Sequence, residues 1–458
     1  MQTALRSSPR FRPPVPRPPD QALPFFTALW KLVDNPIEAW PRAVFEDPHY
    51  VRSDNQRAFV YVTEPEALRA ILLDEADAFP KDWMFERVVK PALGEGLLTA
   101  QGEHWRWQRR AAAPAFRHDL ILGMTPVMTR AAETALERWR TAGEGVSFDI
   151  AHEMTQVTFD VILETMLSGG EGIDIAETTR QIANYLESLG RVTPADILGW
   201  PDWARQALAP KGQKSVRYMK SMMDQMVRRR RSQPPRDDLV ELLLQAKDPE
   251  TGQVMDDGLV RDNLLTFLGA GHETTALALT WSLYLLASDP ESEARVLAEI
   301  AAVAGEDSIT ADHLEHLVFT RQVIQEAMRL FPSLPIMTRM CDRTVQAGSL
   351  KIEAGSYIFI PLYALHRHRA LWKDPDVFDP DRFAPGSPEA NRRFAYMPFG
   401  AGPRICIGAT FAMNEAIAVL ATLIRGARFG HDSRRFIRPL VRISMRPEGG
   451  MPMTVRRR

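Results

Sequence analysis

A single cysteine on a glycine-rich loop is the feature of the sequence with the clearest chemical meaning. Cys406 lies in residues 399–408, which read FGAGPRICIG. Glycines permit backbone conformations that other residues avoid, so this loop can curl around the sulfur and aim its N–H groups there. Such hydrogen bonds favour the thiolate, the form that binds metals, over the thiol. The pattern predicts a metal-bound thiolate, and a small buried cysteine near a turn is the alternative.

The helix expected after this loop would favour the thiolate further. Apolar side chains recur with helical spacing over residues 409–425, and Gly426 follows as a glycine typical of a helix end. The N-terminal end of a helix carries a partial positive charge. We therefore expect this end to lower the pKa of Cys406.

Residues 399–408 match the haem-ligand loop F-x-x-G-x-R-x-C-x-G of the cytochrome P-450 family of haem-thiolate monooxygenases. The chain resembles a soluble, bacterial-type member of this family from near Tyr50 to its final helix. The resemblance implies a mainly α-helical fold, with a large helical domain and a small β-rich lobe around one buried haem b. It makes Cys406 the axial ligand of the haem iron and places three further loop residues at the cofactor: Phe399, Gly400 and Gly408.

Residues 270–275, AGHETT, lie in the middle of a long apolar helix pattern and fit the family pattern A/G-G-x-D/E-T-T/S. The Thr274 hydroxyl can donate a hydrogen bond to the carbonyl of Ala270 four residues earlier, which bends helices. Reduction of dioxygen at a haem needs protons, hence a hydroxyl beside the haem and a carboxyl connected to bulk water. By motif, Thr274 and Glu273 are this catalytic pair, and Ala270 lies at the cofactor. The alternative is a polar interruption in a core helix, which would leave Glu273 buried and unpaired.

The two propionates of a haem need cations held in place. Trp105 and Arg109 lie four residues apart, hence on one helical face, and match the family's W-x-x-x-R. Arg339 and Arg404 match two further propionate positions, and the planar guanidinium suits them because it pairs with carboxylates through two hydrogen bonds. A surface arginine is the alternative for any one of them.

Three residues are expected to form a structural ionic network. Glu326 and Arg329 lie three apart on one helix face, and Arg382 belongs to the segment FDPDRF at 378–383, which matches the family's F-x-P-x-R-F. By resemblance, the three form a buried network that fixes the long loop before Cys406.

Composition narrows the class of protein. The chain has 458 residues, 45% apolar and 25% charged, which excludes disordered and fibrous classes. A net charge of −2 gives no bulk attraction for nucleic acid, and the basic run 228–231 is interpreted as a solvated helix end. Only two cysteines occur, which fits a reducing compartment. We expect a cytoplasmic monomer without a signal peptide or membrane anchor, because the longest uncharged apolar run, 276–287, is too short to span a bilayer.

The chain divides into two parts by composition. Residues 1–24 are predicted to form a proline-rich extended arm, and residues 25–458 a single haem-thiolate monooxygenase domain. A hairpin is expected over 50–63, with its turn at 54–56. Helix starts are expected at Asp289-Pro290 and near Thr310.

The resemblance also implies the reaction. One atom of O2 would enter a lipophilic small molecule and the other would leave as water. The electrons would come from NAD(P)H through a separate ferredoxin or flavodoxin and its reductase, because the chain offers no flavin, nicotinamide or iron–sulfur motif. Arginines that could receive an acidic redox partner are Arg110, Arg117, Arg392 and Arg393, although solvated arginines explain them equally well.

Two other functions remain open at this point. A haem-based gas sensor would need no proton delivery, and a peroxide-driven peroxygenase would need no redox partner. The Glu273–Thr274 pair speaks against both. By family position, the substrate pocket draws on the mostly apolar residues 83–89, 182–203, 264–269 and 333–337.

Overall fold

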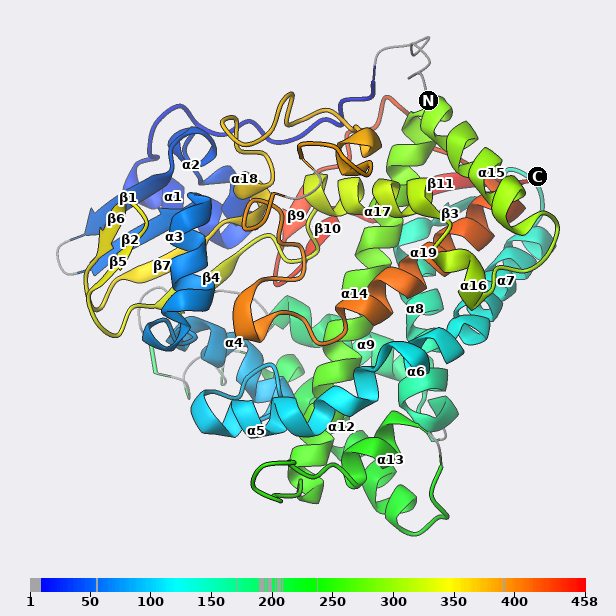
Figure 1. Ribbon diagram of the computed structural model, residues 1–458, viewed down its shortest axis with the longest axis horizontal. Coiled ribbons are helices and arrows are strands. Elements are labelled where there is room, and N and C mark those ends of the chain that lie inside the picture. The colour runs from blue at the N-terminus through cyan, green and yellow to red at the C-terminus, as the bar shows by residue number, and fades with distance from the viewer. Residues whose placement is uncertain are drawn as a thin grey trace.

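Helix α14 (Asp257–Ser288) runs through the middle of the molecule, and most other helices pack around it (Figure 1). It begins where the Asp256 side chain accepts a hydrogen bond from the Leu259 N–H at 2.8 Å. Buried residues occur on all its faces, as expected for a helix inside the core of a large protein. A computed structural model describes residues 10–54, 57–170, 172–188, 193, 196, 200–201, 203, 207, 209–236, 238–389 and 392–458.

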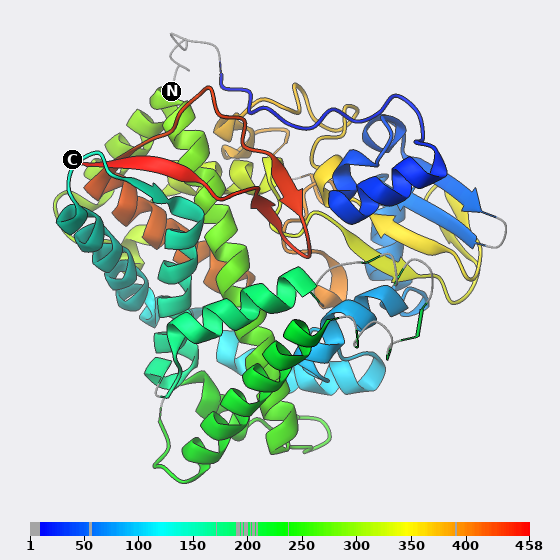
Figure 2. The same ribbon diagram turned by 180° about the vertical axis from the view of Figure 1, so that it is seen from behind.

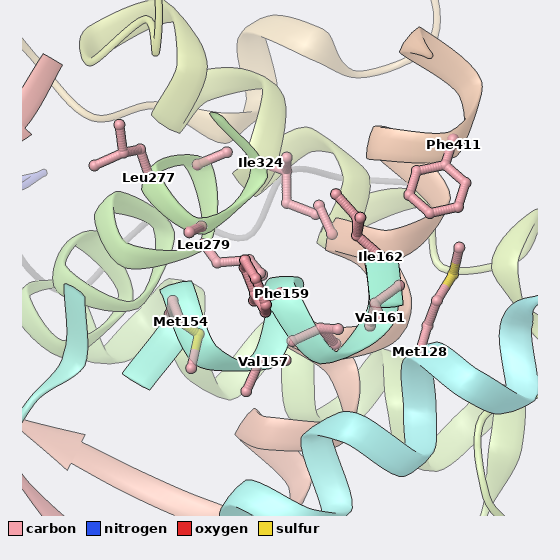
Figure 3. Packing of buried hydrophobic residues seen from close by; sticks show 14 of the residues in the cluster. Met128, Met154, Val157, Phe159, Val161, Ile162, Leu277, Leu279, Ile324 and Phe411 are labelled. Carbon is pink, nitrogen blue, oxygen red and sulfur yellow. The ribbon is translucent and has the colours of Figure 1, made fainter. Parts of the chain in front are cut away.

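Five long helices form the core with α14. Four of them contact α14 directly, and α7 packs on α8 and α19: α7 (Thr125–Ala142), α8 (Ile150–Met166), α12 (Pro210–Arg231), α17 (Val318–Leu330) and α19 (Ala409–Gly426). Figure 3 shows apolar side chains of α7, α8, α14, α17 and α19 in one cluster, among them Phe159, Leu279 and Phe411. Burial of each such side chain stabilises the fold by roughly 1.5–3 kcal/mol.

The predicted helix after the cysteine loop is confirmed, but the role of its final glycine is different. Gly426 is the last residue of α19 rather than a cap beyond it. A Cβ on Gly426 would lie 2.5 Å from Cδ1 of Leu136 in α7. The glycine therefore allows α19 and α7 to approach closely, and no left-handed backbone conformation is involved.

The remaining helices complete the helical part and flank the sheet. Two predicted starts are confirmed: Asp289 accepts a hydrogen bond from the Ser292 N–H at 3.2 Å, and Thr310 forms a capping box with His313. The remaining α-helices of the described residues are α1 (Phe25–Asp34), α2 (Ala43–Glu46), α3 (Pro65–Arg69), α4 (Trp83–Leu93), α5 (Gly102–Ala112), α6 (His118–Gly123), α9 (Ile175–Ser188), α13 (Leu239–Leu244), α15 (Pro290–Ala304), α16 (Ala311–Leu314) and α18 (Leu362–Leu365).

A four-stranded sheet forms the small lobe, in the order β1-β2-β7-β4. Its strands are β1 (His49–Asp54), β2 (Arg57–Val62), β4 (Met337–Met340) and β7 (Tyr357–Ile360). The predicted hairpin is confirmed as β1–β2, while residues 55 and 56 of its turn lie outside the described residues. Strand β2 pairs with β7 in parallel, so the N-terminal hairpin joins a segment almost 300 residues later in the chain. A separate cluster of buried apolar residues, including Val62, Leu68 and Ile358, packs this lobe.

Three smaller sheets complete the β structure of the described residues, and the first of them joins segments about 300 residues apart. Strands β3 (Ser147–Asp149), β11 (Pro452–Arg457) and β8 (Ala427–Gly430) form one, in the order β3-β11-β8. Strand β5 (Val345–Ala347) pairs with β6 (Leu350–Ile352). Strand β9 (Pro439–Val441) pairs with β10 (Met445–Pro447), and this β9–β10 hairpin reaches α14.

The described part of the N-terminal arm, residues 10–24, is in neither helix nor strand and lies against the body (Figure 2). The Phe11 ring packs edge-on against Tyr284 of α14 with centroids 5.9 Å apart, and the Phe11 carbonyl accepts a hydrogen bond from the Phe378 N–H at 2.9 Å. Residues 1–9 lie outside the described residues. The division of the chain at residue 24 stays a prediction.

The basic run at the end of α12 is only partly solvated. Arg230 is buried and forms ion pairs with Asp238 at 3.3 Å and Glu241 at 3.2 Å. The helical period turns this one side chain inward toward α13, which corrects the interpretation of the whole run as a solvated helix end.

Among the described residues, no helix is long and apolar enough to cross a bilayer.

The predicted ionic network is confirmed. Glu326 and Arg329 of α17 are fully buried and paired, with Nε–Oε2 at 2.6 Å and Nη2–Oε1 at 2.8 Å. Arg382 lies 3.5 Å from Glu326 and also pairs with Glu389 at 2.9 Å. Arg329 donates further hydrogen bonds to the carbonyls of His366, Pro375 and Val377. One buried guanidinium thus fastens the long loop before Cys406 to helix α17.

We expect Glu326→Ala to lose about 3–5 kcal/mol of stability, because Arg329 would be left buried without its counter-charge. This loss is a large share of the roughly 5–15 kcal/mol that typically holds a protein folded. The measurements are the yield of soluble protein and the thermal unfolding midpoint. Asp432→Ala is the matched control, since it removes an ion pair with the exposed Arg434 and should leave both unchanged. Equal midpoints for the two variants would contradict a structural role of the network.

Candidate active site

The loop that carries Cys406 is closed by its own backbone. The Cys406 N–H donates a hydrogen bond to the Phe399 carbonyl at 2.9 Å. Gly400 and Gly402 have φ angles of 75° and 71°, in the left-handed region that favours glycine. A Cβ on Gly402 would lie 1.8 Å from the Leu72 carbonyl oxygen, so no larger residue fits there. Gly408 has an ordinary φ of −90° and directly precedes α19.

The Cys406 thiol is accessible, although many protein atoms surround its sulfur. Burial raises the pKa of this thiol, and the Gly408 N–H and the Arg109 guanidinium offset only part of the rise. The expectation that the loop and the helix end would lower the pKa is therefore wrong for the protein by itself. Desolvation of a thiolate outweighs these few favourable contacts. A bound metal ion would reverse the balance, because a coordinating thiol is deprotonated outright.

Arg404 and Trp105 join the cysteine loop to helix α5. The Arg404 guanidinium lies over the Trp105 ring, 4.3 Å from its centroid, and donates a hydrogen bond to the Ala100 carbonyl at 3.0 Å. Arg109 lies one turn after Trp105 in α5, as predicted, and acts electrostatically on Cys406. The loop, α5 and the cysteine therefore meet in one place.

Three half-buried cations gather beside this place. Arg339 of β4, Arg404 and Lys81 repel one another: burial lowers the pKa of Arg404 to about 10, and Arg339 adds to this effect. Burial likewise lowers the pKa of Arg339, and that of Lys81 falls well below its usual range through burial, Arg404 and Arg339. The cluster has the charge to bind an anionic group. Lys81 could not be predicted from the sequence, because it belongs to no recognised motif.

Strand β4 is held in place by a buried carboxylate. The Asp82 side chain caps α4 by accepting from the Phe85 N–H at 2.9 Å, and it also accepts hydrogen bonds from the Thr338 and Tyr357 hydroxyls. Thr338 directly precedes Arg339. One carboxylate thus joins α4, β4 and β7 and fixes the strand that carries Arg339.

The predicted hydrogen bond within α14 is present. The Thr274 hydroxyl donates to the Ala270 carbonyl at 2.7 Å, and α14 continues as one helix through this segment. A Cβ on Gly271 would lie 2.6 Å from Cδ1 of Ile162, so this glycine lets α8 pack closely. His272 is buried, and its Nδ1 lies 2.7 Å from the Leu268 carbonyl, in keeping with a structural role. Ala270, by contrast, is exposed, although Leu268 and His272, two residues away on either side, are buried.

Glu273 is neither unpaired nor freely solvated. Its side chain is 18% exposed, and Oε1 accepts hydrogen bonds from the Ser444 hydroxyl at 2.7 Å and from Nη2 of Arg446 at 2.5 Å. Both partners come from the β9–β10 hairpin. The sequence predicted a carboxyl connected to bulk water and missed these partners, because they lie more than 170 residues away without a recognised motif.

Aromatic packing connects the cysteine loop with α14. A Cβ on Gly408 would lie 3.8 Å from the Phe116 ring, and Phe116 packs edge-on against Phe267 of α14 with centroids 5.3 Å apart. On the other side, a Cβ on Gly400 would lie 3.7 Å from the sulfur of Met337 in β4. The loop therefore lies between α14 and the small lobe.

Comparison with known proteins identifies the family. The family model described as cytochrome P450 matches residues 16–449, nearly the whole chain. The chain is a cytochrome P450. Members of this family bind haem and use O2 with electrons derived from NAD(P)H, so this P450 is a haem-dependent monooxygenase.

Relatives of this P450 occur in plants, animals and bacteria. It is 32% identical to a cytokinin hydroxylase of Arabidopsis thaliana, covering 89% of this chain and 83% of the relative. It is also 32% identical to cyclooctatin synthase of Streptomyces melanosporofaciens, covering 85% and 83%. The crystal structure of a cytochrome P450DA mutant haem domain superposes with a TM-score of 0.78 at 25% identity, over 90% of both chains. The P450 fold predicted from the sequence is thereby confirmed.

The residues at the site fit the chemistry of a haem. A haem presents a metal ion and two carboxylates, and here an accessible thiol lies beside Arg109, near the Arg339, Arg404 and Lys81 cluster. The burial that lowers the pKa of these cations would be offset by carboxylates bound among them.

A buried acid lies in α19, the helix that follows the cysteine loop. Glu415 of α19 is fully buried, and neither of its oxygens has a hydrogen-bond partner among the residues that the structure describes. Burial raises the pKa of Glu415 well above its usual range, and the nearby Thr275 side chain offsets only a small part of the cost. The motif search did not single out this residue.

We expect Glu415→Gln to stabilise this P450 at neutral pH relative to acid pH. The pKa of Glu415 is higher in the folded than in the unfolded protein. The contribution of this one group to the stability of the wild type therefore falls as pH rises above about 4.5, by at most about 1.4 kcal/mol per pH unit. Glutamine cannot ionise and avoids this loss. The test compares thermal unfolding midpoints at pH 4.5 and pH 7, with Glu137→Gln as the exposed control. A difference between variant and wild type that does not change with pH would mean that Glu415 ionises normally.

Proposed function

We propose that this P450 hydroxylates a lipophilic small molecule, with two electrons supplied by a separate redox protein. The observation that carries the proposal is the placement of Glu273 and Thr274, both hydrogen-bonded, in the middle of α14, the helix that packs through Phe267 and Phe116 toward the cysteine loop. The relatives named hydroxylases support the reaction type.

The cofactor is assigned to residues of the cysteine loop, α5, β4 and α14. Cys406 would bind the haem iron, and Phe399, Gly400 and Gly408 would shape the loop around it. When bound, a haem with a thiolate ligand supplies the activation of dioxygen. The residues assigned to the two propionates, and the helix residue assigned to the face of the ring, are Trp105, Arg109, Arg339, Arg404 and Ala270. To these we add Lys81, whose repulsion by Arg339 and Arg404 supports a common anionic ligand.

Thr274 and Glu273 are assigned the delivery of protons. The Thr274 hydroxyl donates to the Ala270 carbonyl, so it is held at one position within the helix and can accept a proton from a neighbouring acid. Glu273 is adjacent in sequence and partly exposed, so it can exchange protons with solvent. The carbonyl of Thr274 accepts a hydrogen bond from Ser333 at 2.7 Å, which fixes this turn of the helix.

The substrate is proposed to be lipophilic because the segments assigned to its pocket are mostly apolar. Val88 and Val89 of α4 and Leu264 and Phe267 of α14 are buried. Much of another of these segments, residues 182–203, lies outside the described residues. A screen of fatty acids, terpenoids, steroids and aromatics for a shift of the haem spin state would identify the class.

The electron donor is proposed to be a ferredoxin or flavodoxin with its reductase. Of the arginines considered for docking, Arg110 is bound to Asp248 at 2.8 Å and Arg117 is paired with Asp119. Their charges are therefore partly neutralised, while Arg393 is exposed. The proposal includes a monomeric enzyme. It also places the enzyme in the cytoplasm, because the low cysteine count fits a reducing compartment.

A peroxygenase and a gas sensor are separated from this proposal by one comparison. NADPH consumption with product formation in a surrogate ferredoxin system supports the monooxygenase. Turnover on hydrogen peroxide alone would indicate the peroxygenase, and ligand binding without turnover would indicate the sensor.

We expect Cys406→Ser to abolish the thiolate-type spectrum of the ferrous–CO complex together with monooxygenase activity, because serine is a poor, hard ligand for this iron. Cys341→Ser is the control at the other cysteine, which is buried in the small lobe. A variant that kept both the spectrum and the activity would refute the assignment of Cys406.

We expect Thr274→Ala to retain haem and substrate binding but to form several-fold less product per NADPH, because proton delivery is impaired and reducing equivalents escape as peroxide. The measurement is product and released peroxide per NADPH consumed. Thr280→Ala is the control, since this threonine makes the same type of bond to Ala276 farther along α14. An unchanged ratio in Thr274→Ala would mean that this hydroxyl only shapes the helix.

A further inference from the structure

The β9–β10 hairpin holds the carboxylate of Glu273 through two donors. The Ser444 hydroxyl and Nη2 of Arg446 donate to the same oxygen, Oε1, at 2.7 and 2.5 Å. Ser444 is buried, and the Arg446 side chain is 28% exposed. Charge-assisted hydrogen bonds in such a partly buried place are stronger than those between exposed groups.

The same hairpin also reaches the backbone at Thr274. The Met445 N–H donates to the Ser333 carbonyl at 2.9 Å, and the Ser333 hydroxyl donates to the Thr274 carbonyl at 2.7 Å. Farther along α14, the Trp281 indole N–H donates to the Met445 carbonyl at 3.3 Å. Both members of the acid–alcohol pair are therefore fixed to one hairpin, Glu273 by its side chain and Thr274 by its backbone.

The hairpin is itself anchored on the side away from α14. The Asn35 side chain donates to the Pro439 carbonyl at 2.9 Å and accepts from the Val441 N–H at 3.1 Å. Arg442 donates to the Asp34 carbonyl at 2.6 Å. Residues 444–446 therefore approach α14 from a rigid support, which is the condition for holding a flexible glutamate in one orientation.

We propose that Arg446 and Ser444 are positioning residues, which hold the Glu273 carboxylate where it can exchange protons with solvent and serve Thr274. The inference rests on the proposed function of Glu273 and Thr274. Without Arg446, the glutamate side chain would be free to adopt other rotamers, and its distance from the Thr274 hydroxyl would no longer be defined.

The first test measures the contact without turnover. Thermal unfolding midpoints are compared for the haem-loaded wild type, Glu273→Gln, Arg446→Gln and the double variant. We expect Arg446→Gln to lower the unfolding midpoint much less in the Glu273→Gln background than in the wild type, because the charged partner of Arg446 is already gone. Arg442→Gln is the matched control on the same hairpin, and its effect should be the same in both backgrounds.

The second test measures what the contact does. We expect Arg446→Gln to lower product per NADPH several-fold while the substrate dissociation constant, read from the haem spin-state shift, stays unchanged. Arg446→Lys should restore most of the coupling, because it keeps the charge, and Ser444→Ala should have a smaller effect than Arg446→Gln.

The outcomes separate this inference from the proposed function. If Thr274→Ala and Glu273→Gln leave the coupling unchanged, the acid–alcohol assignment fails. If these two variants uncouple turnover but Arg446→Gln does not, or if the unfolding effects of Arg446 and Glu273 are additive, only the positioning role is overturned. A fall in coupling that Arg442→Gln reproduces would also overturn it, since it would reflect general damage to the hairpin.

Discussion

The polar side chains at residues 272–274 of the largely buried helix α14 all have hydrogen-bond partners, and these contacts organise much of the structure around the helix. Thr274 satisfies its hydroxyl within the helix, while His272 bonds to the Leu268 carbonyl. Glu273 cannot be satisfied locally, so the β9–β10 hairpin reaches across to it. An unpaired carboxylate at this depth would cost several kcal/mol, which explains why segments distant in sequence converge on one turn of α14.

Electrostatics around the cysteine point to a site built for a charged cofactor. Three half-buried cations repel one another, and desolvation disfavours the thiolate, so the protein alone carries unfavourable interactions in both places. A haem offsets both at once, because its carboxylates neutralise cations and its iron binds the sulfur. Cofactor binding is therefore expected to stabilise the folded protein as well as enable its chemistry.

The loop that carries the thiol depends on contacts made elsewhere. Arg329 holds the long segment before the loop by donating to three backbone carbonyls. Glu326 neutralises the charge of this buried guanidinium. The Leu72 carbonyl of the small lobe leaves no space for a side chain at Gly402. Neither contact touches the chemistry, yet both limit where the cysteine can lie.

The sequence by itself determined the family, the fold class, the helices α14, α17 and α19, and the ionic network of Glu326, Arg329 and Arg382. These follow from local patterns: helical spacing, caps such as Asp289, and motifs with fixed spacing. It also predicted the bond from Thr274 to Ala270, because both groups lie on one helix. Only the tertiary structure decided the partners of Glu273, the cation Lys81, the buried Glu415 and the inward turn of Arg230. Each of these depends on burial or on a contact with a distant segment, and neither the free energy of desolvation nor a long-range pairing is encoded in a local spacing. For the same reason the pKa of Cys406 was predicted in the wrong direction, since the loop pattern shows the hydrogen bonds but not the burial that outweighs them.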